Sequence, residues 1–294
     1  MSERIQTITV LGAGSTGRGV AYLAAQAGYR TILEDISGQA IDLVLAQIGQ
    51  MATQQVQAGH VDAQEAEAIL RRIEPERALE NAAAEADLIL EAVSEDMETK
   101  IEVWTIVDRA SGPHCLFAST TSSFSITEMA AVTYRAPQFL GMHFAHPVLE
   151  ASLLELVRGL ETSEETLAAA EQVGLGMGKT VVRVKESPGF ITGRISALIA
   201  NEAFHMLGEG VATAADIDRA VELGLHHPQG PLELSDQVGL DARWDQLEQL
   251  RRTFGEKYRP APLLAQYVKA GRLGRKTGRG VYDYGTSKRQ AGKT

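Results

Sequence analysis

Short runs of Val, Ile and Leu alternate with stretches of helical periodicity in the first part of the chain. Such runs predict buried strands, because β-branched and aliphatic side chains pack well on a pleated surface. They lie at residues 7–11, 29–33, 87–92, 116–118, 139–144, 153–157 and 180–184. Helices are predicted at residues 20–27, 37–58, 63–72 and 95–107. This alternation predicts an α/β domain with a mostly parallel sheet and helices on both faces.

The pattern changes after Ser187-Pro188-Gly189, a sequence typical of a linker. Residues 190–207 are apolar nearly all around the helix that they predict, so this helix should be buried inside a helical domain or at a subunit interface. Further helices are predicted at residues 216–223, 237–253 and 262–270. We therefore expect two domains, an α/β domain at residues 1–185 and an all-α domain at residues 186–294.

Charge supports this division and narrows the class of partner. Residues 1–185 carry 13 Lys and Arg against 25 Asp and Glu, whereas residues 186–294 carry 15 against 13. The net charge of −10 and the lack of a basic run in the body of the chain argue against a nucleic-acid partner.

No run of about 18 apolar residues occurs, so no membrane span is expected. The single cysteine, Cys115, excludes an internal disulfide, and the first strand follows the N-terminus without room for a signal peptide, so we expect a cytoplasmic protein.

A glycine-rich motif follows the first predicted strand at once. Its glycines have the spacing G-x-G-x-x-G, and a predicted helix comes next. In this context the first glycine permits a tight turn, the second lets the backbone approach a pyrophosphate, and the third lets helix and strand pack closely. The residues expected to bind the cofactor phosphates are Gly12, Ala13, Gly14, Ser15, Thr16 and Gly17. A glycine-rich turn in an unrelated α/β protein is the alternative.

Asp35 ends the second predicted strand and indicates which dinucleotide is bound. It lies 18 residues after Gly17, where a carboxylate bonds the ribose hydroxyls of NAD and repels the 2′-phosphate of NADP. We therefore expect NAD as the cofactor.

Besides a nicotinamide site, an alcohol dehydrogenase needs a base that takes the proton of the substrate hydroxyl. Cys and His are not clustered as zinc ligands, so an organic base is expected and no metal. His143 and His146 lie at the end of an apolar strand, where ligands gather in open α/β sheets. Glu155 lies in the apolar run LLELV, where a buried carboxylate needs a partner such as histidine. Each has a simpler alternative: a packed or surface histidine, or a solvated glutamate at a strand edge.

At this point the motifs match a known family: the chain resembles the L-3-hydroxyacyl-CoA dehydrogenases, most closely the short-chain 3-hydroxybutyryl-CoA type. The resemblance extends from about Ile8 to Tyr284. Its motifs, in order, are GAGSTGRG, EAVSEDMETK, ASTTSS, GMHFAHP, LLELVRG, SPGFITGR, HPQGPLEL and LGRKTGRGVYDY. It implies an N-terminal Rossmann-like domain with a mostly parallel sheet and an all-α C-terminal domain that forms a homodimer.

The resemblance also implies roles for single residues. His143 corresponds to the catalytic base, Glu155 to the acid that orients it, and Ser119 to the serine that holds the 3-oxygen of the substrate. The positions that match NAD contacts are Glu95, Lys100, Ser122 and Lys276.

Several departures from the family pattern bear on the substrate. Thr120, His146 and Gly193 stand where the family has asparagine, and the latter two are substrate-binding positions. The family also carries lysines around residues 50–60 that meet the phosphates of coenzyme A, but this chain has no Lys or Arg between Arg30 and Arg71. A polyanionic group binds chiefly through such cations.

The sequence therefore predicts an NAD-dependent oxidoreductase that interconverts a 3-hydroxyacyl compound and its 3-oxo form, with a short-chain 3-hydroxyacyl-CoA as the family default. One alternative is a relative that acts on a small molecule without CoA: a free β-hydroxy acid, a carrier-bound acyl group, or a carbonyl or imine compound. A non-catalytic NAD-binding protein is a further alternative, against which the joint presence of His143, Glu155 and Ser119 argues.

Overall fold

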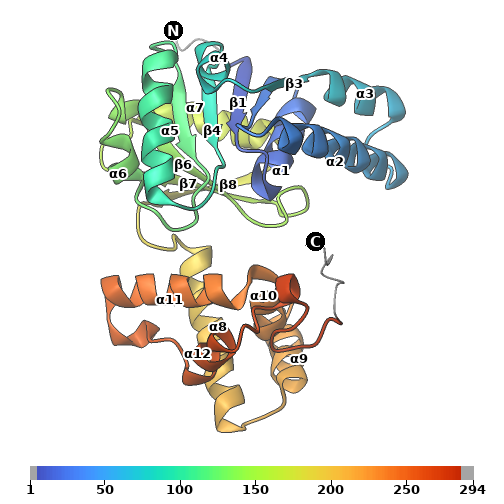
Figure 1. The fold of residues 1–294 in the computed structure, drawn as a ribbon, viewed down its shortest axis with the longest axis vertical. Coiled ribbons are helices and arrows are strands. Elements are labelled where there is room, and N and C mark those ends of the chain that lie inside the picture. The colour runs from blue at the N-terminus through green and yellow to red at the C-terminus, as the bar shows by residue number, and fades with distance from the viewer. Residues whose placement is uncertain (1–4, 286–294) are drawn as a thin grey trace, which may run out of the picture. The chain divides into compact units, whose positions relative to one another are not determined.

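The chain divides into two compact units, Met1–Ser187 and Pro188–Thr294. In the computed structural model, residues 5–285 are described, and Figure 1 labels most of their helices and strands. The first unit contains the sheet and the second is helical.

The first unit is built on an eight-stranded sheet in the order β3-β2-β1-β4-β5-β6-β7-β8. All neighbours pair in parallel except β6 and β7, which are antiparallel. The strands are β1 (Thr7–Leu11), β2 (Arg30–Glu34), β3 (Ile73–Glu76), β4 (Leu88–Glu91), β5 (Leu116–Ser119), β6 (Phe139–Phe144), β7 (Leu153–Arg158) and β8 (Thr180–Lys185). The predicted α/β fold with a mostly parallel sheet is confirmed.

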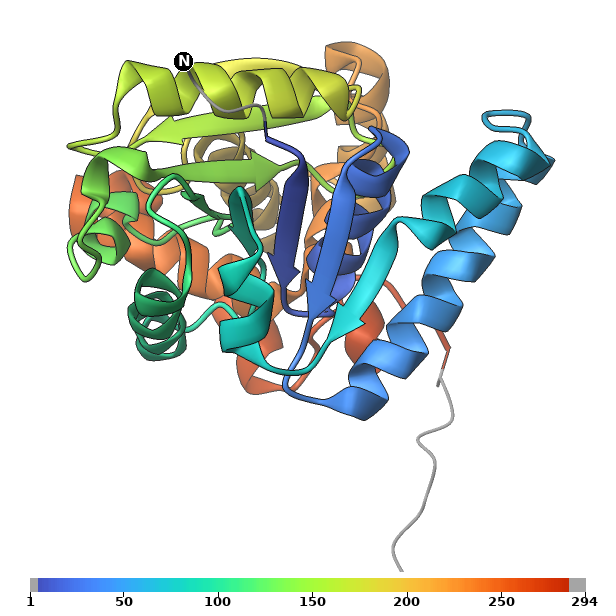
Figure 2. The same cartoon turned by 90° about the horizontal axis from the view of Figure 1, so that it is seen from above.

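Helices cover both faces of this sheet (Figure 2). Val10 of β1 packs in a core shared with α1 and α7, whereas the neighbouring Thr9 donates a hydrogen bond to Ala82 O of α4 on the other face. The helices are α1 (Ser15–Gln26), α2 (Gly38–Gln57), α3 (Ala63–Arg71), α4 (Leu79–Ala84), α5 (Met97–Ala110), α6 (Ile126–Ala130) and α7 (Glu164–Gly176). Because successive side chains of a strand point to opposite faces of the sheet, each face packs against its own layer of helices.

Local sequence explains where several of these elements begin, and why one strand went unpredicted. Ser37 and Asp62 accept hydrogen bonds from Ala40 N and Glu65 N at the starts of α2 and α3, because cap side chains satisfy amides that the helix leaves unpaired. Strand β3 reads Ile-Glu-Pro-Glu and has no apolar pattern. It lies at the edge of the sheet, where proline and charge are tolerated.

The second unit is a cluster of helices around one apolar core. Its helices are α8 (Thr192–Glu209), α9 (Ala214–Leu225), α10 (Pro231–Val238), α11 (Leu240–Phe254) and α12 (Pro262–Lys269). The single helix predicted at residues 237–253 is wrong in its first turn. Gly239, with φ of 106°, separates α10 from α11, because only glycine adopts that conformation without strain.

Helix α8 is less uniformly buried than its sequence predicts. Ala197, Ala203 and Phe204 are packed in the core of the second unit, but Ile195 is 55% exposed. An apolar side chain of that size on the surface of α8 leaves a face of this helix available for another contact.

Candidate active site

The glycine-rich loop between β1 and α1 shows why each glycine is required. A Cβ on Gly17 would lie 1.9 Å from Gly12 O, and a Cβ on Gly12, which has a φ of 97°, would lie 2.6 Å from Ala92 O. A Cβ on Gly14 would have no other atom within 4 Å, so the outer side of this glycine is open. The loop is therefore tight against the strands but open where a ligand would approach the first turn of α1.

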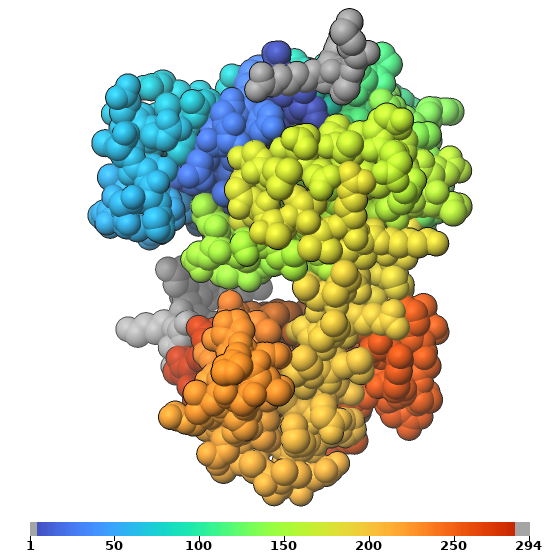
Figure 3. Space-filling view, turned by 180° about the vertical axis from the view of Figure 1, so that it is seen from behind, coloured from blue at the N-terminus to red at the C-terminus, as the bar shows by residue number. Residues whose placement is uncertain are grey.

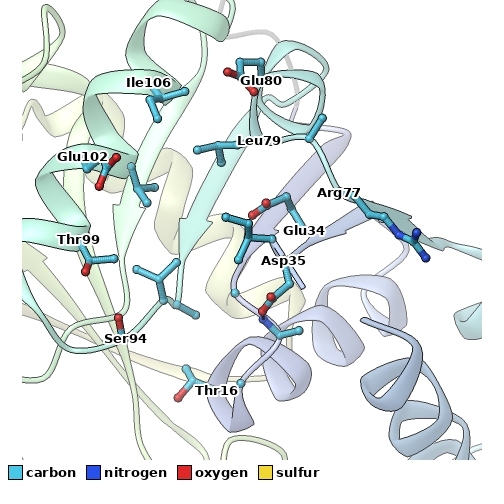
Figure 4. Close-up of a pocket in the computed structure, with 18 of the residues that line it drawn as sticks. Thr16, Glu34, Asp35, Arg77, Leu79, Glu80, Ser94, Thr99, Glu102 and Ile106 are labelled. Carbon is cyan, nitrogen blue, oxygen red and sulfur yellow. Dashed lines mark hydrogen bonds between the residues drawn. The ribbon is translucent and has the colours of Figure 1, made fainter. Parts of the chain in front are cut away.

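A cavity of about 830 Å³ lies beside this loop at the carboxyl ends of β1, β2 and β4. Figure 4 shows Glu34, the last residue of β2, and Asp35, the next residue, pointing into it, with Leu79 and Ile106 on the opposite wall. Asp35 Oδ2 accepts a hydrogen bond of 2.9 Å from Ala13 N. The carboxylate is thus tied to the phosphate-binding loop, and the size and donor set of the cavity fit a dinucleotide.

Glu34 is a second acid in this cavity, and sequence reasoning assigned it no role. It is 6% exposed, and burial together with the charges of Asp35, Glu76 and Glu80 raises its pKa to about 7. In the sequence, the signal for a role of Glu34 was its position next to Asp35 at the end of an otherwise apolar strand. The cavity therefore holds, beside Asp35, an acid that titrates near neutral pH.

His143 and Glu155 face each other across the antiparallel pair β6 and β7. His143 Nδ1 lies 2.7 Å from Glu155 Oε2, and the glutamate side chain is 1% exposed. Strand β7 is paired on both sides, so the alternative of a solvated glutamate at a strand edge is wrong. Because Glu155 bonds His143 at Nδ1, Nε2 is the ring nitrogen through which His143 would exchange a proton with a ligand.

Ser119 is held by Glu91, which Lys100 holds in turn, and sequence reasoning gave neither residue this role. Its Oγ donates a hydrogen bond of 2.6 Å to Glu91 Oε2, and Lys100 Nζ donates one of 2.6 Å to Glu91 Oε1. All three side chains are buried. A buried carboxylate needs such a pairing, since an unpaired charge in the interior is costly. The acid at the end of the apolar run LILE was the signal for Glu91.

Glu95 joins the segment after β5 to this cluster. Its Oε1 accepts hydrogen bonds from Thr121 Oγ1 at 2.6 Å and from Ser122 N at 3.1 Å, and its Oε2 lies 3.2 Å from Lys100 Nζ. The structure therefore brings together three of the residues predicted to contact NAD, Glu95, Lys100 and Ser122, although Ser122 is 27 residues from Glu95 in the sequence.

His146 follows β6 and lies near the glycine-rich loop. Its Nε2 is 3.3 Å from Thr16 Oγ1. Burial lowers the pKa of His146, and the nearby His143 lowers it further. A neutral imidazole can both donate and accept a hydrogen bond, as the amide expected at this position would.

Comparison with known proteins decides the family. Residues 7–187 match the family described as "3-hydroxyacyl-CoA dehydrogenase, NAD binding domain", and residues 189–284 match "3-hydroxyacyl-CoA dehydrogenase, C-terminal domain". The chain belongs to the 3-hydroxyacyl-CoA dehydrogenase family. It is an NAD-dependent oxidoreductase that acts on a CH–OH group, as the resemblance implied.

Three relatives show the extent of the similarity. The chain is 42% identical over 281 residues to the probable 3-hydroxybutyryl-CoA dehydrogenase of Bacillus subtilis, covering 95% of this chain and 98% of the relative. The solved (S)-3-hydroxybutyryl-CoA dehydrogenase of Ralstonia eutropha has a TM-score of 0.92 and 40% identity, covering 96% of this chain and 100% of that one. A solved diketoreductase acting on dicarbonyl compounds has a TM-score of 0.83 and 27% identity, covering 96% and 99%.

The remaining predicted site residues of this dehydrogenase lie in its second unit. Lys276 Nζ forms an ion pair of 2.6 Å with Asp241. Gly193 lies in the first turn of α8, where its carbonyl accepts a hydrogen bond of 3.3 Å from Gln246 Nε2. Within residues 5–285 the dehydrogenase has no group of three or more His, Cys, Asp or Glu placed to hold a metal ion. No helix in the same range is both long and apolar enough to span a membrane.

Proposed function

We propose that this dehydrogenase interconverts a short-chain 3-hydroxyacyl-CoA and the corresponding 3-oxoacyl-CoA. The observation that carries the proposal is the hydrogen bond of 2.7 Å between His143 Nδ1 and Glu155. The names of the Bacillus and Ralstonia relatives point to the four-carbon thioester. When bound, NAD accepts or returns the hydride at the substrate carbon.

In this proposal His143 takes the proton of the 3-hydroxyl at Nε2, and Glu155 stabilises the imidazolium that results. Ser119 Oγ contacts the 3-oxygen, with Glu91 fixing its orientation. The phosphates of NAD lie at the loop from Gly12 to Gly17, and Asp35 bonds the ribose. The further residues that would contact NAD are Glu95, Lys100, Ser122 and Lys276, and those that would contact the substrate are His146 and Gly193.

The direct test is NADH oxidation with acetoacetyl-CoA by the purified protein and by the variant His143→Gln. Turnover by the unmodified protein, lost in the variant while NADH binding measured by fluorescence persists, is expected. If neither acetoacetyl-CoA nor any other 3-oxo compound is reduced, the proposed function is wrong.

A second candidate is reduction of a 3-oxo compound without CoA, and one observation favours it. Helices α2 and α3 form an outer surface of the first unit, light blue in Figures 2 and 3. This surface carries the acids Asp42, Asp62, Glu65 and Glu67, and residues 31–70 contain no Lys or Arg. Such a surface repels the phosphates of CoA. The diketoreductase relative is named for dicarbonyl compounds. Comparing kcat/KM for acetoacetyl-CoA and free acetoacetate separates the candidates.

We also propose a cytoplasmic homodimer that acts in fatty acid metabolism. The exposed Ile195 of α8 and the small apolar cavity beside it support a dimer contact through the second unit. The buried free thiol of Cys115 suits a reducing compartment. Sedimentation should give a dimer at micromolar concentration; a monomer alone would contradict this assembly.

A further inference from the structure

Glu34 is a buried acid of the first unit whose side chain has no partner. It is 6% exposed, and within residues 5–285 its carboxyl group forms no hydrogen bond and no ion pair. Figure 4 shows this carboxyl group pointing into the cavity beside the glycine-rich loop. Burial of a polar group without a hydrogen bond costs stability. A ligand in the cavity is the partner that would offset this cost.

The acids next to Glu34 do not share this deficit, because backbone amides bind them. Asp35 accepts hydrogen bonds of 2.9 Å from Ala13 N and from Ser37 N. Glu76, the register partner of Glu34 on β3, accepts hydrogen bonds from the two backbone amides that follow it. The chain therefore supplies donors to the carboxyl groups on either side of Glu34 and none to Glu34 itself.

The surroundings of Glu34 favour its neutral form. Burial raises the pKa of Glu34 to about 7, and so do three nearby acids, Asp35, Glu76 and Glu80. The other charged groups that line the cavity, Arg77 and Glu102, are exposed to solvent. A protonated carboxyl group has one O–H donor and one carbonyl acceptor, the same pair of groups that a side-chain amide has. Near neutral pH, Glu34 therefore presents both a donor and an acceptor to the cavity.

The position of Glu34 in the cavity indicates which part of NAD would reach it. In the proposed placement of the cofactor, the phosphates lie at the glycine-rich loop and the ribose at Asp35. The part of the lining farther from the loop is largely apolar, with Leu79, Val103 and Ile106. Apolar side chains fit the flat faces of a base, whereas polar groups fix its orientation. Glu34 is the buried polar side chain beside these apolar residues, so the base is the part of the cofactor that it would meet.

We propose that Glu34 recognises the adenine base of NAD by donating a hydrogen bond from its neutral carboxyl group to a ring nitrogen. The inference rests on the proposed placement of the cofactor and extends it by assigning the contact to the base. Adenine has a ring nitrogen beside its amino group, so the carbonyl oxygen of the same carboxyl group would accept from that amino group. Side-chain amides bind adenine through the same two bonds. Ionisation of Glu34 removes the donor, and the affinity for the cofactor therefore falls as the pH rises.

The test measures dissociation constants at about pH 6 and pH 8.5, for NADH by fluorescence and for ADP-ribose, which lacks the nicotinamide, by calorimetry. Glu34→Gln keeps a donor and an acceptor at every pH, and Glu34→Leu has neither. Glu102→Gln is the matched control, because it neutralises an exposed acid of the same cavity.

In the unmodified protein and in Glu102→Gln, both dissociation constants should rise about tenfold from the lower pH to the higher. Glu34→Gln should bind both ligands at the higher pH about as tightly as the unmodified protein does at the lower pH. Glu34→Leu should bind them about 5–30-fold more weakly than Glu34→Gln at either pH, the effect of losing the two hydrogen bonds to the base.

Melting curves without ligand show whether each variant folds. If Glu34→Leu does not fold, the pH dependence of Glu34→Gln decides alone. The assignment is overturned if the pH dependence persists in Glu34→Gln, or if a folded Glu34→Leu binds both ligands as tightly as Glu34→Gln does. If the unmodified protein binds neither NADH nor ADP-ribose, the proposed cofactor site is wrong, and the contact with adenine is wrong with it.

Discussion

Ser119 Oγ donates its hydrogen bond to Glu91 Oε2, so the serine reaches any ligand as a hydrogen-bond acceptor in this arrangement. The two residues lie on adjacent parallel strands, and their Cα atoms are register partners. Lys100 neutralises the second oxygen of Glu91. Because the one proton of the substrate hydroxyl goes to His143 in the proposed reaction, Ser119 would contact the 3-oxygen by turning its own hydroxyl from Glu91 to the substrate.

Replacing Glu91 should therefore affect both stability and turnover. Glu91→Gln leaves Lys100 with only the more distant Glu95, and we expect the free energy of unfolding to fall by about 2–4 kcal/mol. With Ser119 less firmly oriented, kcat should fall roughly tenfold. Urea unfolding and steady-state kinetics measure the two effects. The double variant Glu91→Gln/Lys100→Met should regain most of the stability but not the activity; recovery of both would mean that Glu91 only balances Lys100.

His143→Gln should lower kcat by about 10²–10⁴-fold, because the variant lacks the group that takes the hydroxyl proton. The dissociation constant of NADH should stay similar. Glu155→Gln should also lower kcat and shift its pH profile, since the imidazolium loses its counter-charge. Retained activity in His143→Gln would assign the proton transfer to another residue, with His146 as the next to replace.

Asp35→Ala should narrow the preference for NADH over NADPH. The carboxylate lines the cavity beside the phosphate-binding loop and repels a 2′-phosphate there. The measurement is kcat/KM with each cofactor in the two proteins, with Glu80→Ala as a control that replaces another acid lining the same cavity. Equal kcat/KM for the two cofactors in the unmodified protein would contradict the assignment.

Glu34 should make stability depend on pH in a definite window. Its pKa is raised from 4.5 to about 7 in the folded protein, so the folded chain keeps this proton when the unfolded chain has lost it. Stability therefore falls as the pH rises from about 4.5 to 7 and is level above that. Glu34→Gln should be more stable than the unmodified protein by roughly 1–3 kcal/mol at pH 8 and no more stable at pH 4.5. Melting curves at the two pH values check this, and an equal difference at both would contradict it.

Lysines on α2 should improve the binding of CoA thioesters. Gln54 and Gln57 are exposed, and Gln54→Lys/Gln57→Lys should lower KM for acetoacetyl-CoA with little change in kcat, the pattern of uniform binding. The effect should weaken at high salt. Gln172→Lys on the exposed side of α7 is the control. A micromolar KM in the unmodified protein that the two lysines do not change would mean that CoA finds other cations.

The sequence by itself determined the elements and the cofactor loop of this protein. Strand and helix periodicities depend on neighbours a few residues apart, so β1, β6 and the capped start of α3 followed from local pattern. The glycines of the loop also act locally, through backbone conformation and close approach. The strand β3 and the break at Gly239 were missed because edge position and tertiary packing outweigh local preference.

Only the tertiary structure decided which charges are paired. Glu91 and Ser119 are 28 residues apart and meet because β4 and β5 are in register, and Glu155 is buried because β7 is paired on both sides. Arg243 could equally have been a surface residue of an amphipathic helix; its burial among neutral groups appears only when α8 and α11 pack. Desolvation and pairing depend on every neighbour in space, and a linear pattern does not contain those neighbours.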